Sequence, residues 1–217
     1  MPNAALFDMD KTLIRVNSAR LFTRYRRERG EVSALEMARV SWWLLRYWLG
    51  NLDANSIATR ALVDYRGFKE SDMIAMCDEW FSSQVKKHIT PAARQAVQRH
   101  REQGDVLIIA STATSYITRP LSQELGMDEV VCTELLVEDG RLTGEVESPI
   151  CYGKGKLERV TKRLDHLGLS LRDATFYSDS ITDLPLMEAV GTAVAVNPDL
   201  RLRSEARRRG WRLELWQ

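Results

Sequence analysis

Acidic residues stand at the ends of two apolar runs in this chain of 217 residues. Asp8 and Asp10 follow the first run, almost at the start of the chain, and Asp179 follows a later run, with Asp183 four residues on. A carboxylate can attack phosphorus and form an aspartyl-phosphate. A second carboxyl group two residues along a strand end can protonate the leaving oxygen. The types and the spacing of these residues therefore indicate phosphoryl-transfer chemistry.

Hydroxyl and ammonium groups occupy comparable places. Ser111 and Thr112 end a second apolar run, while Lys154 and Lys156 stand near the start of a predicted helix. In an open α/β sheet the active site lies at the carboxyl ends of the strands. We therefore expect these side chains to meet the four aspartates at one edge of the sheet. A lysine and a hydroxyl beside a cation would form an electrostatic cradle for a phosphoryl group.

The four aspartates call for a cation, because like charges that share a small site disfavour one another. An oxygen-only set of few ligands suits Mg²⁺, which keeps several waters and takes one or two carboxylates plus a phosphate oxygen. Zinc would want His or Cys, and neither belongs to these motifs. We therefore expect Mg²⁺ as the cofactor and a small phosphate ester as the partner molecule.

The elements that must position these residues alternate between strand and helix. Apolar strands are predicted at residues 4–8, 105–111, 174–179 and 192–197. The other predicted elements of this region are helices at 91–104, 115–126, 154–168 and 182–191, and a β-hairpin at 130–146 that turns at Asp139–Gly140. This alternation predicts the α/β class, with a Rossmann-like, doubly wound and mostly parallel sheet.

The region between the first two strands has a helical pattern throughout. Helices are predicted at 18–30, 33–50, 53–67 and 70–88, and no strand signal interrupts residues 18–88. We therefore expect a catalytic core formed by residues 1–14 and 89–217, with an inserted α-helical unit at residues 15–88. The basic stretch at 201–213 is interpreted as a solvated helix face and tail.

The composition narrows the class of protein. The formal net charge of +1 gives no global field that would attract nucleic acid. Three cysteines without a CxxC pair are typical of a reducing compartment. The stretch at 40–52 is too short to span a bilayer and is interrupted by Arg46, and the two early aspartates exclude a secretory signal. We expect a cytoplasmic soluble protein without stable membrane insertion, either a monomer or a weak homodimer.

Four motifs in order carry a family resemblance. "FDMDKTL" at 7–13 resembles the first motif of the haloacid dehalogenase superfamily, and "LIIAST" at 107–112 resembles its second. "KGKLERV" at 154–160 and "YSDSITDLP" at 177–185 resemble the third and fourth. The chain is similar to subfamily IB, the phosphoserine phosphatase-like branch, in which the helical insert would be a cap of the C1 type. The resemblance implies a Mg²⁺-dependent phosphomonoesterase.

The first motif implies roles for three residues. Asp8 would be the nucleophile that forms the phospho-enzyme and would also bind the metal ion. Asp10 would protonate the leaving alcohol and then activate water, while its backbone carbonyl would touch the metal. The backbone amide of Met9 would face the phosphate, and Thr12 would support the turn.

The other motifs imply the remaining roles. Ser111 would hydrogen-bond a phosphoryl oxygen, with the Thr112 backbone beside it. Lys156 would neutralise the charge of the nucleophile and of the phosphoryl group. Lys154 competes for this role, but Lys156 is preferred because its spacing to Asp179 resembles that in the phosphoserine phosphatases. Asp179 would bind Mg²⁺, and Asp183 would complete the acidic metal shell. Asp183 could also cap the following helix.

The helical insert should set the specificity. The phosphoserine phosphatases carry a glutamate nine residues after the nucleophile to read the substrate amine, whereas this chain has Asn17. Arg60 could bind a substrate carboxylate or lie on a solvated helix face. Histidinol phosphate, phosphoserine and lysophospholipid phosphates stay open as substrates. Four tryptophans could form the centre of the cap, with some facing the substrate: Trp42, Trp43, Trp48 and Trp80.

Three other activities compete with this interpretation. A non-hydrolytic phosphotransferase would use the same residues. A phospho-receiver module shares the aspartate, the hydroxyl and the lysine, but would lack Asp10 and the insert. A membrane-docking protein on an inactive fold is disfavoured because all catalytic positions are filled.

The histidines and cysteines outside the motifs are predicted to have no role in catalysis. His88, His100 and His166 are predicted to lie on the surface. Cys77 and Cys132 are predicted to be small core residues, while Cys151 could line the pocket.

Overall fold

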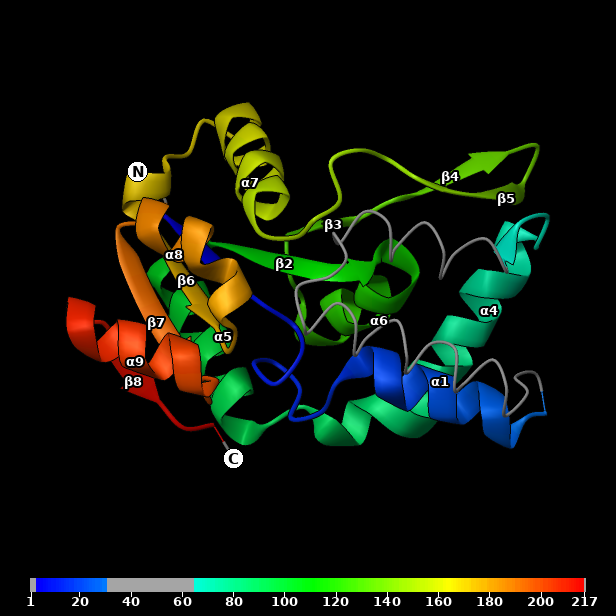
Figure 1. Ribbon diagram of the computed structural model, residues 1–217, viewed down its shortest axis with the longest axis horizontal. Helices are drawn as coiled ribbons and strands as arrows, with labels where there is room; N and C mark the ends of the chain where they lie inside the picture. The colour runs from blue at the N-terminus through cyan, green and yellow to red at the C-terminus, as the bar shows by residue number, and fades with distance from the viewer. Residues whose placement is uncertain (1–2, 31–64, 217) are drawn as a thin grey trace.

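The computed structural model describes residues 3–30 and 65–216 (Figure 1). Its strands are β1 (Ala4–Phe7), β2 (Val106–Thr114), β3 (Glu129–Thr133), β4 (Leu135–Glu138), β5 (Arg141–Val146), β6 (Ala174–Ser178), β7 (Thr192–Val196) and β8 (Arg212–Glu214). Its α-helices are α1 (Ser18–Glu28), α4 (Glu70–Trp80), α5 (Pro91–Gln103), α6 (Ser115–Leu125), α7 (Lys154–His166), α8 (Leu184–Ala189) and α9 (Leu200–Arg209).

The main sheet has six strands in the order β3-β2-β1-β6-β7-β8, and every neighbouring pair is parallel. Along the chain, β1 is followed by β2 on one side, and β6 then joins β1 on its other side. The strand order therefore reverses between β1 and β6. Such a switch point opens a crevice at the carboxyl ends of the two strands. The predicted fold class, a doubly wound and mostly parallel α/β sheet, is confirmed.

Helices cover both faces of this sheet, which explains why its strands are apolar on both sides. Leu6 and Phe176 point to the face that carries α7, α8 and α9, and they share a buried cluster with Val160, Leu186 and Leu202 from those helices. Phe7 and Tyr177 point to the opposite face, which carries α5 and α6. Figure 1 shows the sheet between these two layers. The side chains of β1 alternate between the two faces, so both helical layers pack against the strand that precedes Asp8.

The hairpin predicted at 130–146 is divided between two sheets. Its first segment is β3, which pairs in parallel with β2, so the prediction of a single hairpin was wrong there. The turn at Asp139–Gly140 does join two antiparallel strands, β4 and β5. Both turn residues have positive φ, 48° and 70°, as a two-residue hairpin turn requires. A run of alternating residues could not reveal that its first part has a partner far away in the chain.

The C-terminal stretch holds more structure than the sequence predicts. Residues 200–209 form α9, whose N-cap Asp199 accepts a hydrogen bond from the Leu202 amide. The chain then adds β8 as a sixth strand beside β7, so the strand at 192–197 is not the last one. Trp216 is buried against Tyr177, with ring centroids 5.4 Å apart. The basic face of α9 is solvated as predicted, but the tail after it belongs to the sheet.

The helical insert is described in two parts, α1 and residues 65–88. The α-helix predicted at 70–88 changes character: α4 ends at Trp80, a π-helical turn follows over Phe81–Val85, and a 3₁₀ turn ends at His88. Trp80 is fully buried and meets Phe22 of α1 edge to face at 5.1 Å. Trp80 is therefore part of the apolar centre, while Trp42, Trp43, Trp48 and Arg60 lie outside the described residues.

The two ends of the insert join the core through one antiparallel contact. Ile14 forms a bridge with Ile89, and the Arg15 amide donates to the His88 carbonyl at 3.0 Å. The hairpin β4–β5 extends away from the main sheet on the same side as the insert, toward α4 (Figure 1). Its Leu142 accepts a hydrogen bond from the Gly67 amide at 2.8 Å. The hairpin, which the sequence places in the core, thus contacts the insert.

His100 is buried, contrary to its predicted surface position. One ring nitrogen lies 2.6 Å from Asp105 and the other lies 2.9 Å from the Tyr177 hydroxyl. Its helix α5 places it against the sheet, where these two polar partners satisfy it. Among the residues that the structure describes, no helix is long and apolar enough to cross a membrane.

Candidate active site

The carboxyl ends of β1 and β6 bring two aspartates together at the switch point. Asp8 and Asp179 each follow the last residue of their strand, and both side chains are buried. The Asp8 amide continues the ladder by donating to the Tyr177 carbonyl at 2.9 Å. After Asp8 the chain turns sharply, with Lys11 at a φ of 54°, and the Lys11 ammonium lies 3.8 Å from the Asp179 carboxylate.

Lys156 reaches these carboxylates from α7. Its side chain is 1% exposed, and its ammonium group donates to Asp8 Oδ1 at 2.9 Å. The same ammonium lies 2.8 and 2.9 Å from the two oxygens of Asp183. Lys154, at the first position of α7, is exposed instead. Of the two lysines that the sequence leaves open, Lys156 is therefore the one at the aspartates.

Asp183 occupies the N-cap position of α8, but its side chain makes no capping hydrogen bond. Its Oδ2 accepts a hydrogen bond from the Ser178 hydroxyl at 2.7 Å, besides its contacts with Lys156. The prediction of a side-chain cap was therefore wrong. The carboxylate is instead turned into the site, where it holds the lysine against Asp8.

Asp10 is held by the start of α1. Its Oδ1 accepts a hydrogen bond from the Ser18 amide at 2.9 Å, and its Oδ2 accepts one from the Asn17 side-chain amide at 3.0 Å. Both carboxylate oxygens are therefore engaged by the first residues of the helical insert. Asp10 is partly buried, and its position two residues after Asp8 places it in the turn beyond the strand.

The electrostatics of the site follow from burial of several acids together. Burial raises the pKa of Asp8 to about 7, although Lys156 opposes the shift. Burial, together with the neighbouring Asp8, raises the pKa of Asp179 to about 8. Burial also raises the pKa of Asp10, against the hydrogen bond from Ser18. For Lys156 burial acts to lower the pKa, but Asp183 and Asp8 outweigh it and raise the pKa above its ordinary value.

The second motif lies where the pairing of β2 with β3 becomes irregular. The register is regular up to Ala110 opposite Val131 and resumes at Thr114 opposite Thr133. Ser111 is buried and accepts a hydrogen bond from the Ala113 amide at 3.2 Å, whereas the side chain of Thr112 is exposed. The strand thus extends beyond its predicted end at 111, with both candidates in the irregular stretch.

The first-motif residues Met9 and Thr12 are both fully buried. The Met9 carbonyl accepts a hydrogen bond from the Ile14 amide at 3.1 Å, which helps to close the turn after β1. The Thr12 hydroxyl has no hydrogen-bond partner within the described residues. The role of Thr12 in supporting the turn stays a prediction.

Sequence reasoning missed three contributors to this arrangement. Lys11 faces Asp179, Ser178 holds Asp183, and Asp199 accepts a hydrogen bond from the Ile181 amide at 2.9 Å. The first two are neighbours of motif aspartates, which is the signal that could have pointed to them. Asp199 follows a different strand, β7, and only the tertiary fold brings it to the loop after Asp179.

Gly155 allows α7 to begin close to the loop before it. A Cβ atom at this position would lie 2.2 Å from the Ile150 carbonyl oxygen, which belongs to the backbone and cannot move aside easily. We expect Gly155→Ala to lower the free energy of unfolding by about 1–3 kcal/mol, the usual cost of overpacking. Chemical denaturation would measure this loss. An unchanged midpoint would contradict the close approach, and Lys154→Ala at the adjacent exposed position is the matched control.

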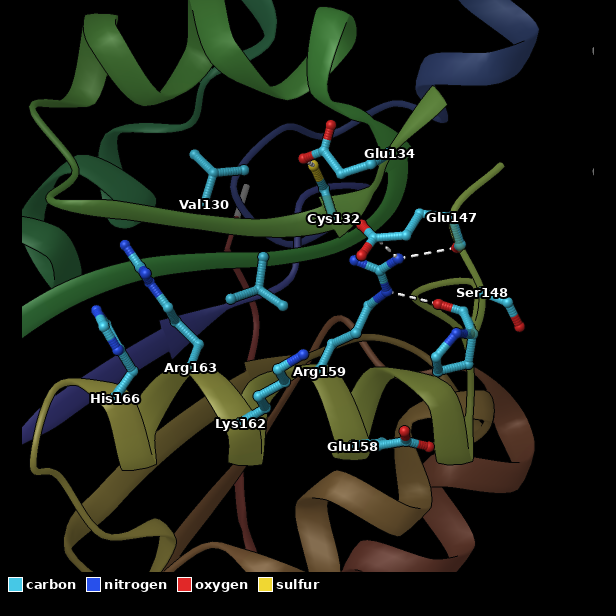
Figure 2. A pocket seen from close by; sticks show the side chains of 12 residues that line it. Val130, Cys132, Glu134, Glu147, Ser148, Glu158, Arg159, Lys162, Arg163 and His166 are labelled. Carbon is cyan, nitrogen blue, oxygen red and sulfur yellow. Dashed lines mark hydrogen bonds and ion pairs between the residues drawn. The ribbon is translucent and has the colours of Figure 1, made fainter. Parts of the chain in front are cut away.

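A hollow of about 610 Å³ lies away from these aspartates, between α7 and β3 (Figure 2). Two of the arginines that line it have partners. Arg159 donates to the Glu147 and Pro149 carbonyls, and Arg163 forms an ion pair with Glu129. Lys156 is not among the residues that line it, because the hollow lies on another side of α7. The residues that could carry out phosphoryl transfer converge at the ends of β1 and β6 and not in this hollow. We therefore place the candidate site at the switch point.

Comparisons with known proteins show the family of this chain. The family model for haloacid dehalogenase-like hydrolases matches residues 5–188. A histidinol-phosphatase from Neisseria meningitidis is 32% identical over 216 residues, covering 97% of each chain. Phosphoserine phosphatase SerB1 from Mycobacterium tuberculosis is 33% identical over 215 residues, covering 97% of this chain and 70% of that protein.

Two solved structures are similar to this chain over nearly its whole length. A protein of unknown function from Bordetella pertussis Tohama I superposes with a TM-score of 0.91 at 30% identity, covering 99% of this chain and 98% of that one. A phospho-aspartyl intermediate analogue of phosphoserine phosphatase has a TM-score of 0.71 at 19% identity, covering 100% and 94%, which shows a shared fold.

The chain belongs to the haloacid dehalogenase-like hydrolase family. The predicted resemblance to this family and to its phosphoserine phosphatase-like members is thereby confirmed. The predicted enzyme class, a phosphatase, agrees with the family and with the names of its relatives. The individual roles of the site residues stay predictions, and they are developed below.

Proposed function

We propose that the protein is a Mg²⁺-dependent phosphomonoesterase that works through an aspartyl-phosphate on Asp8. The observation that carries the proposal is the contact of the buried Lys156 ammonium with Asp8, beside Asp179 and with Asp10 two residues on. A lysine in this place orients the nucleophile and offers positive charge to a phosphoryl group. Family membership and relatives named as phosphatases support the same reaction.

The donor set fits Mg²⁺. Two ammonium groups, Lys156 and Lys11, face four carboxyl groups, so the ammonium groups can balance only two of the four carboxylates when all are ionised. The side chains of Asp8 and Asp179 and the backbone carbonyl of Asp10 would hold the ion, with substrate and water oxygens completing its shell. Within the described ranges, no group of three or more His, Cys, Asp or Glu side chains is arranged to hold a metal ion. The proposed site needs only two such side chains.

Asp183 was predicted to complete the acidic metal shell, and this role stays a prediction. Its oxygens contact Lys156 and Ser178, so we propose that it supports the lysine from this position, while Asp8 and Asp179 supply the direct metal ligands. A bound Mg²⁺ would supply positive charge that stabilises the phosphoryl oxygens during transfer.

The first half-reaction uses Asp8 and Asp10. An oxygen of Asp8 attacks phosphorus and forms the aspartyl-phosphate, while the bond from phosphorus to the alcohol oxygen breaks. Protonated Asp10 gives its proton to that oxygen, so the alcohol leaves neutral. Lys156 holds the attacking carboxylate in place through its 2.9 Å hydrogen bond to Asp8. Ser111 and the Met9 and Thr112 backbones would bind the phosphoryl oxygens.

The second half-reaction reverses the role of Asp10. Its carboxylate takes a proton from a water molecule as the water oxygen attacks phosphorus. The bond between phosphorus and Asp8 then breaks, which releases phosphate and restores the free carboxylate. Hydrolysis rather than transfer to another alcohol requires only that water reaches this position. A phosphotransferase would differ in the acceptor and not in the residues.

The named relatives suggest a class of substrate. The curated relatives include a histidinol-phosphatase and a phosphoserine phosphatase, and both names describe small phosphorylated metabolites that carry an amine. We propose a small phosphate ester of this kind as the substrate. We also propose that residues 15–88 act as the cap over the core, with Trp80 in its apolar centre and the hairpin β4–β5 bound to it at Gly67.

A phosphate-release screen tests this function. The purified protein would be offered histidinol phosphate, phosphoserine, a sugar phosphate and lysophosphatidic acid, each with Mg²⁺ and with EDTA. We expect release that requires Mg²⁺ and that strongly favours one compound. Release that persists in EDTA would contradict the metal assignment. The absence of release from every compound, in folded protein with Mg²⁺, would contradict the phosphomonoesterase.

A further inference from the structure

Asn17 stands at the junction of Asp10 and the helical insert. It is the N-cap of α1, and its side-chain Oδ1 accepts a hydrogen bond from the Arg20 amide at 3.0 Å. Its Nδ2 donates in the other direction, to Asp10 Oδ2 at 3.0 Å. One amide group therefore connects the first turn of α1 with the carboxyl group that the proposed reaction uses twice.

The contact completes the hold on Asp10. The adjacent Ser18 amide donates to Asp10 Oδ1 at 2.9 Å, so each carboxylate oxygen has one donor, and both donors come from the start of α1. These two bonds fix the direction of the carboxyl plane. Rigid placement matters for an acid and base, because proton transfer requires the carboxyl oxygen within hydrogen-bond reach of the reacting oxygen.

We propose that Asn17 is a positioning residue that ties the Asp10 carboxyl group to the N-terminus of α1. The inference rests on the proposed function, because it gives Asp10 the acid and base role.

A simple capping role would predict different behaviour. Ser and Asp are both good N-caps, because each can accept the hydrogen bond from the helix amide. Neither can donate as the Asn amide does: the shorter Ser does not span the distance to Asp10, and an ionised Asp brings a second negative charge against it. Asn17→Ser therefore keeps the helix cap and removes the hydrogen bond to Asp10. Asn17→Asp keeps the cap but replaces that hydrogen bond with repulsion between two carboxylates.

The test compares two leaving groups. A nitrophenolate leaves readily without a proton, whereas a simple alcohol needs one, so only the alkyl ester depends strongly on Asp10 in the first half-reaction. We expect Asn17→Ser to lower kcat/KM for an alkyl phosphate about tenfold, a part of the total effect of general acid catalysis. The kcat/KM for 4-nitrophenyl phosphate should fall less than about twofold, because it reports only the first half-reaction. Asn17→Asp should widen this difference.

Controls separate the possible failures. Thr23→Ala removes a partly exposed hydroxyl on the same helix, which within the described residues bonds only to the Ala19 carbonyl, and should leave kcat/KM for both esters unchanged. Equal losses with both esters in Asn17→Ser, or no loss with either, would overturn the positioning role while leaving the phosphatase intact. A wild-type protein that hydrolyses neither ester, or an equally active Asp8→Asn variant, would overturn the proposed function and this inference with it.

Discussion

Asp8→Asn should reduce phosphate release to below about one ten-thousandth of the wild-type rate, because the amide cannot act as the nucleophile. The substitution conserves the shape of the side chain. Its carbonyl oxygen can still accept the hydrogen bond from Lys156, which lies 2.9 Å away in the native protein. We therefore expect the cooperative thermal transition to persist. Phosphate release and a melting curve on the same sample measure the two outcomes.

A matched control and a trapping experiment sharpen this prediction. Asp165→Asn makes the same chemical change at an exposed position on α7 and should retain full activity. When wild-type protein is quenched with acid during turnover, its mass should be increased by one phosphoryl group. The mass of Asp8→Asn treated in the same way should not change. Retained turnover in Asp8→Asn, or a phosphoryl group found on another residue, would refute the aspartyl-phosphate on Asp8.

Lys156→Met should be damaging for stability as well as for activity. The ammonium is almost completely buried and contacts both Asp8 and Asp183. Methionine fills a similar volume but leaves two buried carboxylates without their partner. Breaking one side of a buried ion pair typically costs about 3–5 kcal/mol. In a chain of this size we expect the melting temperature to fall by roughly 10 °C, and turnover should be lost at every Mg²⁺ concentration.

Lys154→Met is the control for this variant, since it removes an ammonium group two residues away on the exposed side of α7. It should change the melting temperature by less than about 2 °C, as most surface substitutions do. If both variants melt alike, Lys156 is not the charge that stabilises the buried acids. If Lys156→Met is stable and still turns over substrate, the proposed reaction is wrong about its central contact.

The amino-acid sequence by itself determined the strand ends and the chemistry that they carry. Asp8, Asp10 and Asp179 follow apolar runs that predict buried strands, and parallel strands place their carboxyl ends at one edge. The same reasoning predicted the parallel sheet, whereas the family was predicted from the resemblance of four motifs in order. These features are local in the chain or follow from the order of its segments, so the sequence alone is sufficient to predict them.

Contacts between distant segments were decided by the tertiary structure. The sequence could not assign β3 to the main sheet or add β8 beside β7, because pairing depends on partners that lie many residues away. It placed His100 on the surface, although packing of α5 against β6 buries that ring beside Tyr177. Burial of a polar side chain depends on partners that a helical pattern does not specify.

The final assignment of roles among the site residues also needed three dimensions. The sequence favoured Lys156 over Lys154 only through its resemblance to the spacing in phosphoserine phosphatases, whereas the structure shows that α7 turns Lys156 toward Asp8. Asp183 reads as a helix cap in the sequence, yet its side chain holds the lysine. A charged side chain pairs with whichever opposite charge the fold buries beside it, because an unpaired buried charge is costly. That choice depends on the whole packed core and is not encoded in any one motif.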